Sequence, residues 1–361
     1  MSRLREVYRA EQLPVFQNRM FATERLARTC TRGDLVLVQD PDTGLVGNQA
    51  FDPALMDYGA DYQNEQGHST AFRRHLDAVA ALVKTHFGGQ TLIEVGCGKG
   101  LLLEQLSDLG FSVTGLDPTY EGANPNIIRE YFTPATGLHA DGLILRHVLE
   151  HVRDPVNFLS QLRLANGGAG KIYIEVPCLD WIAGHHAWFD LFYEHVNYFR
   201  LPDFERMFGQ VHESGRMFGG QYLYVIADLA SLRTPTAAAQ DRFALPAGFL
   251  DTLNQCAERL KTIDRTQQRR AAVWGGASKG VIFSLFMERA GARVDTIIDM
   301  NPAKQGKYIA ATGLLVQSPE QALLQLHPGD DIFVMNRNYL SEIRDMTAHQ
   351  FNYIPVEHED L

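Results

Sequence analysis

Residues 91–100 read TLIEVGCGKG, an apolar run followed by a loop that contains three glycines. The run TLIEV is typical of a buried strand, and the LLLEQLSDLG that follows is typical of a helix. Gly96, Gly98 and Gly100 let the backbone turn sharply and approach a ligand where a Cβ atom would clash. The first turn of the helix offers N–H groups that have no partner within the helix. The stretch therefore predicts a strand–loop–helix unit with a ligand site at the loop.

Strands and helices alternate on both sides of this unit. SVTGLD, GLILRHVL and KIYIEVP read as further buried strands, PVNFLSQLRLA as a helix opened by proline, and QYLYVIADL as a closing strand. A second alternation, with AAVWGGASKG, VDTIIDMNP and DIFVMN, follows nearer the C-terminus. The fold class is therefore α/β: a Rossmann-like doubly wound sheet plus a second, smaller Rossmann-like domain.

Composition shifts give the expected divisions of the chain. Residues 1–70 read as an irregular N-terminal region with clustered turn residues. The main α/β domain is expected at 71–230 and the smaller one at 271–361. Between them, at 231–270, we expect a linker rich in Ser, Thr, Pro and Ala and then a long helix.

Charge and cysteine usage limit the function classes. The chain has 361 residues and a formal net charge of −10, which argues against nucleic acids or an anionic membrane surface as partners. No apolar run reaches membrane-spanning length, and the N-terminus is too polar for a signal peptide. The four cysteines are scattered without a C-x-x-C pair, which fits a reducing cytoplasm and predicts no disulfide framework. We expect a cytoplasmic protein whose partner is a small molecule.

The ligand of the glycine loop is indicated by two acids. The loop has the pattern E-x-G-x-G-x-G with Glu94 in front, whereas a dinucleotide fingerprint is G-x-G-x-x-G. The next strand ends at Asp117, followed by Pro118, where a carboxylate can accept hydrogen bonds from ribose hydroxyls. The pattern resembles the first motif of class I methyltransferases that use S-adenosylmethionine (SAM). This resemblance implies SAM as the cofactor.

The segment GLILRHVLEHVRDP supports this interpretation. It resembles the methyltransferase segment in which an apolar strand runs into a short H-V-L-E-H-type helix. Arg146 and His147 follow at the carboxyl end of the strand, where α/β sheets bind ligands, so both are candidate cofactor contacts. For either residue alone, a surface or core role is equally compatible with the sequence.

Residues 190–199, DLFYEHVNYF, place Tyr193, Glu194 and His195 among apolar and aromatic neighbours. The run follows the strand KIYIEVP, so it is expected over the same carboxyl edge of the sheet, where the methyl acceptor should lie. A glutamate can orient a neighbouring histidine and keep it basic, and such a histidine can act as a general base. Transfer to carbon needs a base because a C–H must first be ionised. A structural histidine paired with its neighbour is the alternative.

The chain from about Leu13 onward resembles the nucleotide-sugar C-methyltransferases, which methylate deoxysugars and carry an N-terminal zinc domain, a SAM domain and a C-terminal domain. Their Y-H-E-H-x-x-Y-F run supplies the proposed base, and Glu194 and His195 match it, whereas Phe192 and Tyr193 depart from it. The resemblance implies His195 as the base and Glu194 as the group that orients it. It also implies a hydroxyl role for Tyr193 and a second proton-transfer or substrate role for His151.

The C-terminal runs GGASKG, DMNPAKQGKYIAATGLLVQSPE and FVMNRNYLSEI also resemble this family. They imply that Ser278, Lys279 and Asn336 contact the substrate, with Lys279 suited to a phosphate of a nucleotide-linked molecule. The stretch DYQNEQGHS lies where the family covers its site, so Tyr62 is a candidate SAM contact. Gln66 and His68 are candidate acceptor contacts.

The N-terminal region departs most from the family. LPVFQNRMF and TGLVGNQAFDP resemble remnants of the zinc domain, but Cys30 is the one cysteine before the glycine loop. A four-ligand zinc site cannot be built from it, so no metal is predicted.

Three alternatives remain open at this stage. The protein can be an O- or N-methyltransferase of another small metabolite. It can be an NAD(P)-binding oxidoreductase or regulator that uses the Gly275–Gly280 loop, with Asp299 at the end of the following strand. It can also be an inactive scaffold that only binds.

Overall fold

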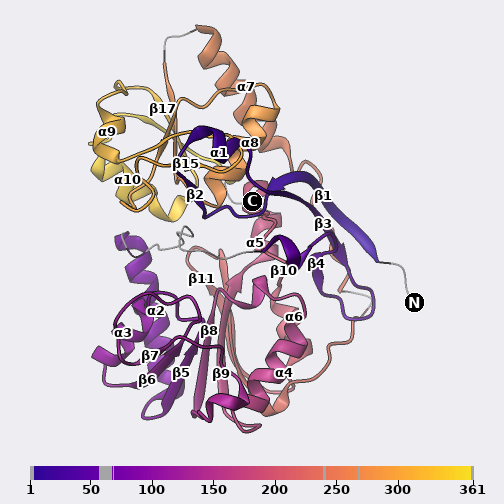
Figure 1. The fold of residues 1–361 in the computed structure, drawn as a ribbon. Coiled ribbons are helices and arrows are strands. Elements are labelled where there is room, and N and C mark those ends of the chain that lie inside the picture. The colour runs from indigo at the N-terminus through magenta and orange to yellow at the C-terminus, as the bar shows by residue number, and fades with distance from the viewer. Residues whose placement is uncertain (1–3, 57–66, 68, 239–240, 267–268, 359–361) are drawn as a thin grey trace.

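The computed structural model describes residues 4–56, 67, 69–238, 241–266 and 269–358 (Figure 1). Its central sheet has seven strands in the order β11-β12-β9-β8-β5-β6-β7. The strands from β9 to β7 pair in parallel, and β11 and β12 form an antiparallel edge. Their bounds are β5 Thr91–Val95, β6 Ser112–Leu116, β7 Ile127–Ile128, β8 Gly142–Arg146, β9 Lys171–Pro177, β11 Val211–Met217 and β12 Tyr222–Asp228.

Helices cover both faces of this sheet, as predicted. Helices α2 and α3 lie on one face, and α4 and α6 lie on the other (Figure 1). The helix before the glycine loop buries the periodic residues Leu76, Val79 and Val83, and the Ser69 hydroxyl caps its first turn. The helix bounds are α2 Thr70–Phe87, α3 Leu101–Asp108, α4 Pro155–Ala165, α5 Leu179–Gly184 and α6 Leu201–Met207. Short 3-10 turns are η1 Pro53–Leu55, η2 Pro134–Thr136, η3 Leu149–His151, η4 Trp188–Asp190 and η5 Leu229–Ser231.

The second alternation forms a smaller, fully parallel sheet in the order β16-β14-β13-β17-β18. The predicted α/β class with a second Rossmann-like unit is thus confirmed. Its strands are β13 Ala271–Trp274, β14 Thr296–Ile298, β16 Val316–Gln317, β17 Asp331–Val334 and β18 Asn352–Pro355. Its helical segments are α7 Asp251–Thr266, α8 Lys279–Arg289, α9 Pro319–Leu323, η7 Arg337–Tyr339 and α10 Leu340–Met346.

The expectation of an irregular N-terminal region is wrong. Strands β1 (Arg5–Pro14), β3 (Arg32–Gln39) and β4 (Val46–Asn48) form a sheet with β10 (Asn197–Tyr198). The period of two in β1 is broken by register shifts, which hid it from pattern analysis. Helix α1 (Glu24–Arg28) follows β2 (Met20–Phe21), which pairs with β15 (Tyr308–Ile309) of the smaller unit.

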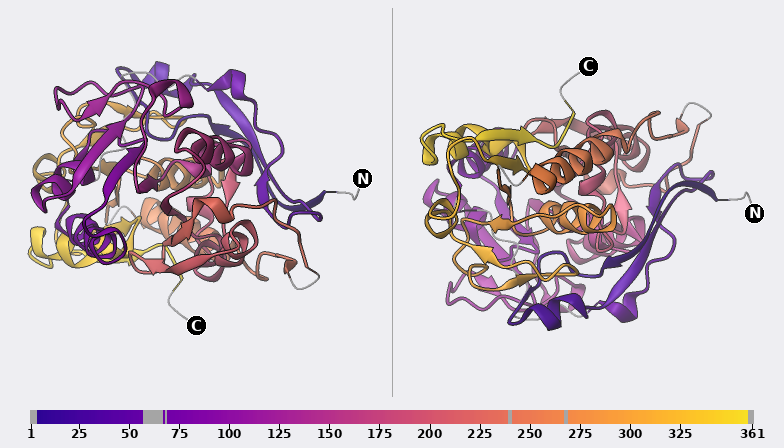
Figure 2. Two further views of the ribbon diagram at one scale, coloured as in Figure 1. Left: turned by 90° about the horizontal axis from the view of Figure 1, so that it is seen from below. Right: turned by 90° about the horizontal axis from the view of Figure 1, so that it is seen from above.

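The N-terminal region therefore contacts both α/β units at once (Figure 2). Its sheet includes β10 from the DLFYEHVNYF run, and its strand β2 extends to the smaller unit. The division at 1–70, 71–230, 231–270 and 271–361 stays a prediction. Among the described residues, no helix is long and apolar enough to span a bilayer.

Candidate functional site

The glycine loop has the conformation that its sequence predicts. Gly96, Gly98 and Gly100 all have positive φ, at 71°, 55° and 84°. A Cβ atom on Gly96 would lie 2.5 Å from Cγ2 of Val148, so the chain after β8 packs directly against the loop. The loop is thus held between β5 and the segment that carries His147, Glu150 and His151.

The carboxylate of Asp117 is tied to the loop. Its Oδ2 accepts a hydrogen bond from the Gly98 backbone N–H at 2.9 Å. Its Oδ1 accepts from the backbone N–H and the hydroxyl of Thr119 at 2.8 and 2.7 Å. Pro118 is exposed beside it. The predicted ribose acid therefore lies at the edge of the loop, at the carboxyl end of β6.

Glu94 lies buried beneath the loop at 3% exposure. Its Oε2 has no hydrogen-bond partner among the described residues. Burial raises the pKa of this carboxyl to about 7, although the positive charge of Arg146 opposes the shift. A buried acceptor without a partner among the described residues, below a loop with three glycines, can accept a hydrogen bond from a cationic group of a ligand.

Glu175 lies on β9, and its carboxylate contacts one arginine and two histidines near the edge of the sheet. Its Oε1 lies 2.8 Å from Nη2 of Arg146 and 3.0 Å from Nε2 of both His75 and His147. Its Oε2 accepts a hydrogen bond from the Tyr173 hydroxyl at 2.7 Å. Burial alone would raise the pKa of Glu175, but the charges of Arg146 and the histidines hold it well below its usual value.

Arg146 and His147 were predicted as cofactor contacts, and the structure places both on Glu175. His147 also pairs through Nδ1 with Oε1 of Glu150 at 3.3 Å. Burial opposes protonation of His147, but its two carboxylate partners raise its pKa to about 9. Arg146 and His147 thus place positive charge at the bottom of the site. Their role toward the cofactor stays a prediction.

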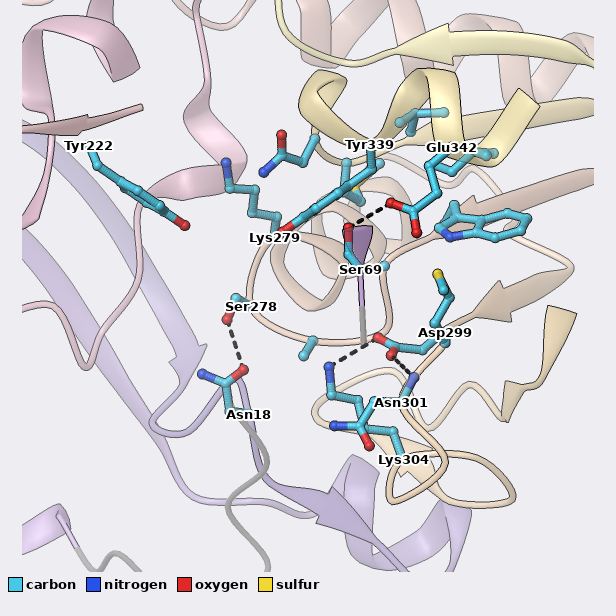
Figure 3. A pocket seen from close by; sticks show the side chains of 18 residues that line it. Asn18, Ser69, Tyr222, Ser278, Lys279, Asp299, Asn301, Lys304, Tyr339 and Glu342 are labelled. Atoms are coloured by element: carbon cyan, nitrogen blue, oxygen red, sulfur yellow. Dashed lines mark hydrogen bonds and ion pairs between the residues drawn. The ribbon is translucent and has the colours of Figure 1, made fainter. Parts of the chain in front are cut away.

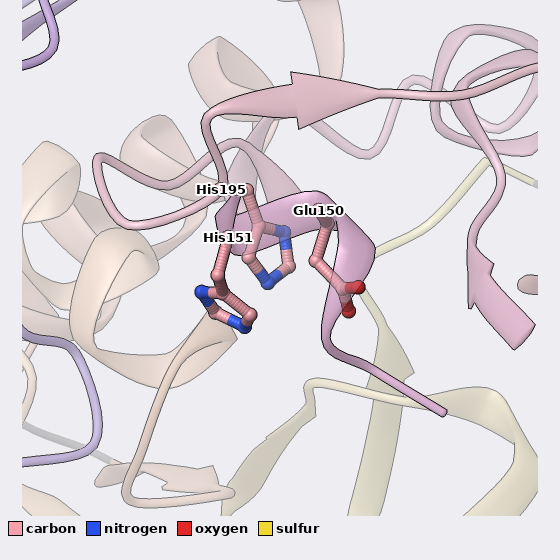
Figure 4. Close-up of side chains that lie close together, drawn as sticks. All are labelled: Glu150, His151 and His195. Carbon is pink, nitrogen blue, oxygen red and sulfur yellow. The ribbon is translucent and has the colours of Figure 1, made fainter. Parts of the chain in front are cut away.

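His151 and His195 come together as the sequence predicts. Their rings lie edge to face with centroids 5.0 Å apart, and Glu150 lies beside them (Figure 4). Nδ1 of His151 lies 2.9 Å from the backbone carbonyl of Glu194. Turn η3 carries the first histidine and the DLFYEHVNYF run carries the second, so two distant segments meet beside the glycine loop.

The expectation that Glu194 keeps His195 basic is wrong. Burial and the positive charges of His151, His147 and Lys279 hold the pKa of His195 well below its usual value. The carboxylate of Glu194 instead accepts a hydrogen bond from the Gln17 backbone N–H at 3.2 Å. His195 is therefore a neutral imidazole near pH 7, available as a proton acceptor but of reduced basicity.

Tyr193 is held against the N-terminal sheet. Its hydroxyl accepts a hydrogen bond from the Asp52 backbone N–H at 2.9 Å, and lies 3.4 Å from the Asp52 carbonyl oxygen. Its ring packs on Gly33, where a Cβ atom would overlap it. These contacts give Tyr193 a structural role and point its hydroxyl toward Asp52.

The smaller unit faces this edge across a cavity of about 180 Å³ (Figure 3). Lys279, at the start of α8, pairs with Asp190 at 2.9 Å and donates to the Gln221 side chain at 3.2 Å. Gln221 and Asn336 exchange side-chain hydrogen bonds of 2.9 and 3.0 Å. Four residues of the two units, Lys279, Asp190, Gln221 and Asn336, thus form a polar bridge beside the cavity.

The remaining residues predicted to contact the cofactor or the substrate fall in two groups. The Ser278 hydroxyl donates to Oδ1 of Asn18 at 2.9 Å and lines the cavity. Tyr62, Gln66 and His68 lie outside the described residues.

The second glycine loop has its own acid. Asp299 accepts from the Gly276 backbone N–H at 2.8 Å and from Nζ of Lys304 at 3.1 Å. The pairing with Lys304 compensates the charge that a ribose-binding acid would present.

Sequence reasoning missed Glu150, Glu175, Asp190 and Gln221. A signal existed for Glu175, because an acid in the apolar strand KIYIEVP must find partners when buried. Glu150 lies between two predicted histidines, in a stretch whose pattern indicates a short helix and gives no separate signal for the acid. Asp190 and Gln221 carried no signal, since their partners come from the other unit.

Residues 67–211 match the family model described as a methyltransferase domain. The ubiquinone biosynthesis O-methyltransferase of Caulobacter sp. (strain K31) is 35% identical over 102 residues, covering 24% of this chain and 40% of that protein. The mitochondrial ubiquinone biosynthesis O-methyltransferase of Arabidopsis thaliana is 31% identical over 100 residues, covering 22% of this chain and 31% of that protein. The chain thus spans less than half the length of these curated relatives.

Solved methyltransferases show limited similarity. The 1,6-didemethyltoxoflavin-N1-methyltransferase of Burkholderia thailandensis, with bound S-adenosylhomocysteine (SAH), has 17% identity and a TM-score of 0.33, covering 43% of this chain and 77% of that one. The magnesium protoporphyrin IX methyltransferase of Synechocystis PCC 6803, with bound SAM, has 15% identity and a TM-score of 0.32, covering 44% and 79%. The parallel sheet, the glycine loop and the family match together identify residues 67–211 as a class I, SAM-dependent methyltransferase domain.

Proposed function

We propose that the protein is a SAM-dependent methyltransferase of a small molecule and that it methylates a carbon next to a carbonyl group. The acceptor class we favour is a keto-sugar linked to a nucleotide. The observation that carries the proposal is the pair His151–His195 with Glu150, packed beside the glycine loop through Val148. O- and N-transfer to a good nucleophile have less need of such a group.

Residues of this chain have distinct roles in the proposed site. The buried Oε2 of Glu94 accepts from the donor's ammonium group, and Asp117 accepts from the ribose hydroxyls. At Gly96, Gly98 and Gly100 the loop has no side chain, so the donor can approach its backbone there. When bound, SAM supplies an electrophilic methyl group on a sulfonium sulfur.

His195 acts on the acceptor in this proposal. A neutral ring nitrogen of His195 takes the proton from the acceptor carbon, and the electron pair of the C–H bond moves onto the carbonyl oxygen as an enolate. The positive charge held at Arg146 and His147 by Glu175 stabilises that negative charge from below. His151 orients the acceptor, and its ring is fixed by the Glu194 carbonyl.

The smaller unit encloses the acceptor in this proposal. Ser278 and Lys279 line the cavity at the start of α8, and Asn336 lines it at the end of β17. Lys279 already pairs with Asp190, so a phosphate would compete with that carboxylate for the ammonium group.

The resemblance to nucleotide-sugar C-methyltransferases supports this choice of acceptor. Glu194, His195 and His151 occupy positions that match that family, although Phe192 and Tyr193 differ from it.

Isotope exchange tests the proposal directly. The protein is incubated in deuterated water with SAH and candidate keto-sugar nucleotides, and deuterium at the carbon next to the carbonyl is followed by mass spectrometry. We expect wash-in with the wild type and a 10²–10⁴-fold slower exchange with His195→Asn, the usual contribution of a general base. Methylated product with no wash-in at any acceptor carbon would refute the carbon-transfer proposal.

O-methylation is the second candidate. The curated relatives that match part of the domain are ubiquinone biosynthesis O-methyltransferases. A ¹³C-methyl label on the donor separates the two outcomes, because methyl groups on oxygen and on carbon have distinct carbon chemical shifts. A label found on oxygen would place the activity with the second candidate.

A further inference from the structure

Three side chains at the carboxyl edge of the main sheet converge on one point (Figure 4). One ligand-type atom from each of Glu150, His151 and His195 lies within 4.8 Å of the other two. Two imidazoles and one carboxylate are the donor set that divalent transition metals use in open, three-residue sites. We propose that Glu150, His151 and His195 bind a divalent transition-metal ion.

Two of these side chains have a buried polar atom without a hydrogen-bond partner among the described residues. Glu150 is only 1% exposed, and its Oε2 has no hydrogen-bond partner among the described residues. Nδ1 of His195 is buried and likewise has none in this part of the chain. An unpaired buried carboxylate oxygen costs free energy that a cation would remove.

The groups behind the proposed ligands are arranged as around a metal. A metal-bound histidine commonly donates its second ring N–H to a carbonyl or carboxylate. Nδ1 of His151 lies 2.9 Å from the Glu194 carbonyl oxygen, so we assign Nε2 as the ligand atom. Glu150 is oriented in the same way, because its Oε1 pairs with His147 at 3.3 Å while Oε2 remains.

The donor set also indicates which ion is bound. Two nitrogen ligands favour Zn²⁺, Co²⁺, Mn²⁺ or Fe²⁺ over Mg²⁺ and Ca²⁺, which prefer oxygen. Metal–ligand bonds of about 2.0–2.2 Å require donor atoms that lie close together, and these three atoms all lie within 4.8 Å of one another. Three protein ligands leave at least one position for water or an oxygen of the acceptor.

A bound metal ion would change which group accepts the proton from the acceptor carbon. This consequence rests on the proposed function, whereas metal binding itself does not. In the metal-free protein His195 is the base of the proposed function, whereas in the metal-bound protein its ring would instead be a ligand of the ion. Glu150, His151 and His195 would then hold the ion, and the ion would supply a bound hydroxide able to accept a proton, because zinc lowers the pKa of its water toward about 7. The donor site at Glu94 and Asp117 is unaffected, so metal binding and SAH binding are separate measurements.

Metal binding is tested with the full chain and Co²⁺ as the probe. The protein is stripped with a chelator, titrated with Co²⁺, and followed by its visible absorption and by elemental analysis. We expect one equivalent per chain, with an absorption band typical of nitrogen and oxygen ligands. Glu150→Gln and His151→Gln each remove one ligand and should abolish the band.

Two further variants sharpen the test. His147→Asn leaves the three ligands but removes the group that orients Glu150, so Co²⁺ affinity should fall about 10- to 100-fold. His86→Gln is the matched control: His86 pairs with Glu213 at 2.6 Å away from the cluster, and its loss should leave Co²⁺ binding unchanged. Circular dichroism and SAH binding confirm that each variant is folded.

Two results would overturn the proposal. One is less than a tenth of an equivalent of Co²⁺ bound by a wild-type chain that still binds SAH. The other is Co²⁺ binding that is equally tight in Glu150→Gln, His151→Gln and the wild type, since the ion would then lie elsewhere. Failure of methyl transfer with Co²⁺ bound as expected would count against the proposed function and leave the metal site standing.

Discussion

Two buried carboxylates with opposite surroundings set the charge of the site. Glu94 has no hydrogen-bond partner for its Oε2 among the described residues, and burial raises its pKa to about 7. Glu175 is surrounded by Arg146, His147 and His75, and its pKa lies well below the usual value. Glu94 can therefore pair with a positively charged group of a ligand, whereas the charge of Glu175 is already compensated by neighbouring side chains.

The state of Glu94 predicts pH-dependent binding of SAH. Its carboxyl has a usual pKa of 4.5 and one of about 7 in the ligand-free protein, and the ligand's ammonium favours the carboxylate. Binding should therefore release a proton between pH 4.5 and 7, and affinity should rise with pH across this window and then level off. Calorimetry in buffers of different ionisation enthalpy measures the released proton.

The control for this prediction is Glu94→Gln. It should bind SAH about 10- to 100-fold more weakly at pH 8, because a charged hydrogen bond of about 1.5–3 kcal/mol is lost. Its affinity should no longer change with pH. An unchanged pH profile in this variant would show that another group carries the proton.

Glu175→Gln should destabilise the protein strongly. The substitution leaves the largely buried Arg146 without its carboxylate partner and His147 with Glu150 alone, and breaking such a buried pair typically costs about 3–5 kcal/mol in the free energy of unfolding. Glu213→Gln removes the more exposed glutamate that pairs with His86, and should cost at most about 1 kcal/mol. Urea denaturation measures both, and equal effects would contradict the assigned role of Glu175.

Single residues were predictable from the sequence where a local pattern required them. The glycines and Asp117 follow from a strand, a loop and a second strand that are contiguous in the chain. His195 is indicated by its apolar run as well as by resemblance, His151 by resemblance alone, and the structure brings the two together. The partners of Glu194 and His147 were not predictable, because they depend on the packing of distant segments.

Among the elements, the strand–loop–helix unit of β5 and α3 connects sequence most directly to the site. Its loop needs glycine for two separate reasons, a positive φ and the close approach of Val148. Short edge strands such as β7 and the interrupted β1 have weak patterns, which explains why the sequence did not indicate them.

Gly96→Ala should abolish or strongly weaken SAH binding. Its Cβ would clash with Val148, so the loop must move away from the segment that carries the histidines. Gly89→Ala is the matched control, because Gly89 also has positive φ, at 74°, but its Cβ would have no neighbour within 4 Å. Both should lose about 1 kcal/mol of stability from backbone strain. Equal SAH affinity in the two variants would argue against the loop as the donor site.

At the scale of the whole molecule, the two α/β units and the N-terminal region enclose a common edge. Lys279, Asp190, Gln221 and Asn336 connect the units beside the cavity. Strand β2 pairs with β15, and β10 joins the N-terminal sheet, so the site is fixed from three sides. This arrangement was beyond sequence analysis, since the predicted linker gives no information on how the units pack.

Lys279→Met should loosen the junction between the units. Asp190 would stay largely buried without its counter-charge, which costs about 2–5 kcal/mol when one partner of such a pair is removed. Lys84→Met, on the exposed face of α2, should change stability by no more than about 0.5 kcal/mol. Tryptophan fluorescence during urea unfolding measures the loss of stability, because the ring centre of Trp181 lies 5.0 Å from Nζ of Lys279. Identical urea unfolding curves for Lys279→Met and Lys84→Met would contradict the role of Lys279 at the junction between the units.

A crystal structure of the full chain with SAH tests the central claim most directly. We predict SAH at the Glu94–Gly100 loop, with its ammonium on Glu94, its ribose on Asp117 and its sulfur facing His151 and His195. SAH bound at the Gly275–Gly280 loop instead, or His195 turned away from the ligand's sulfur, would contradict it.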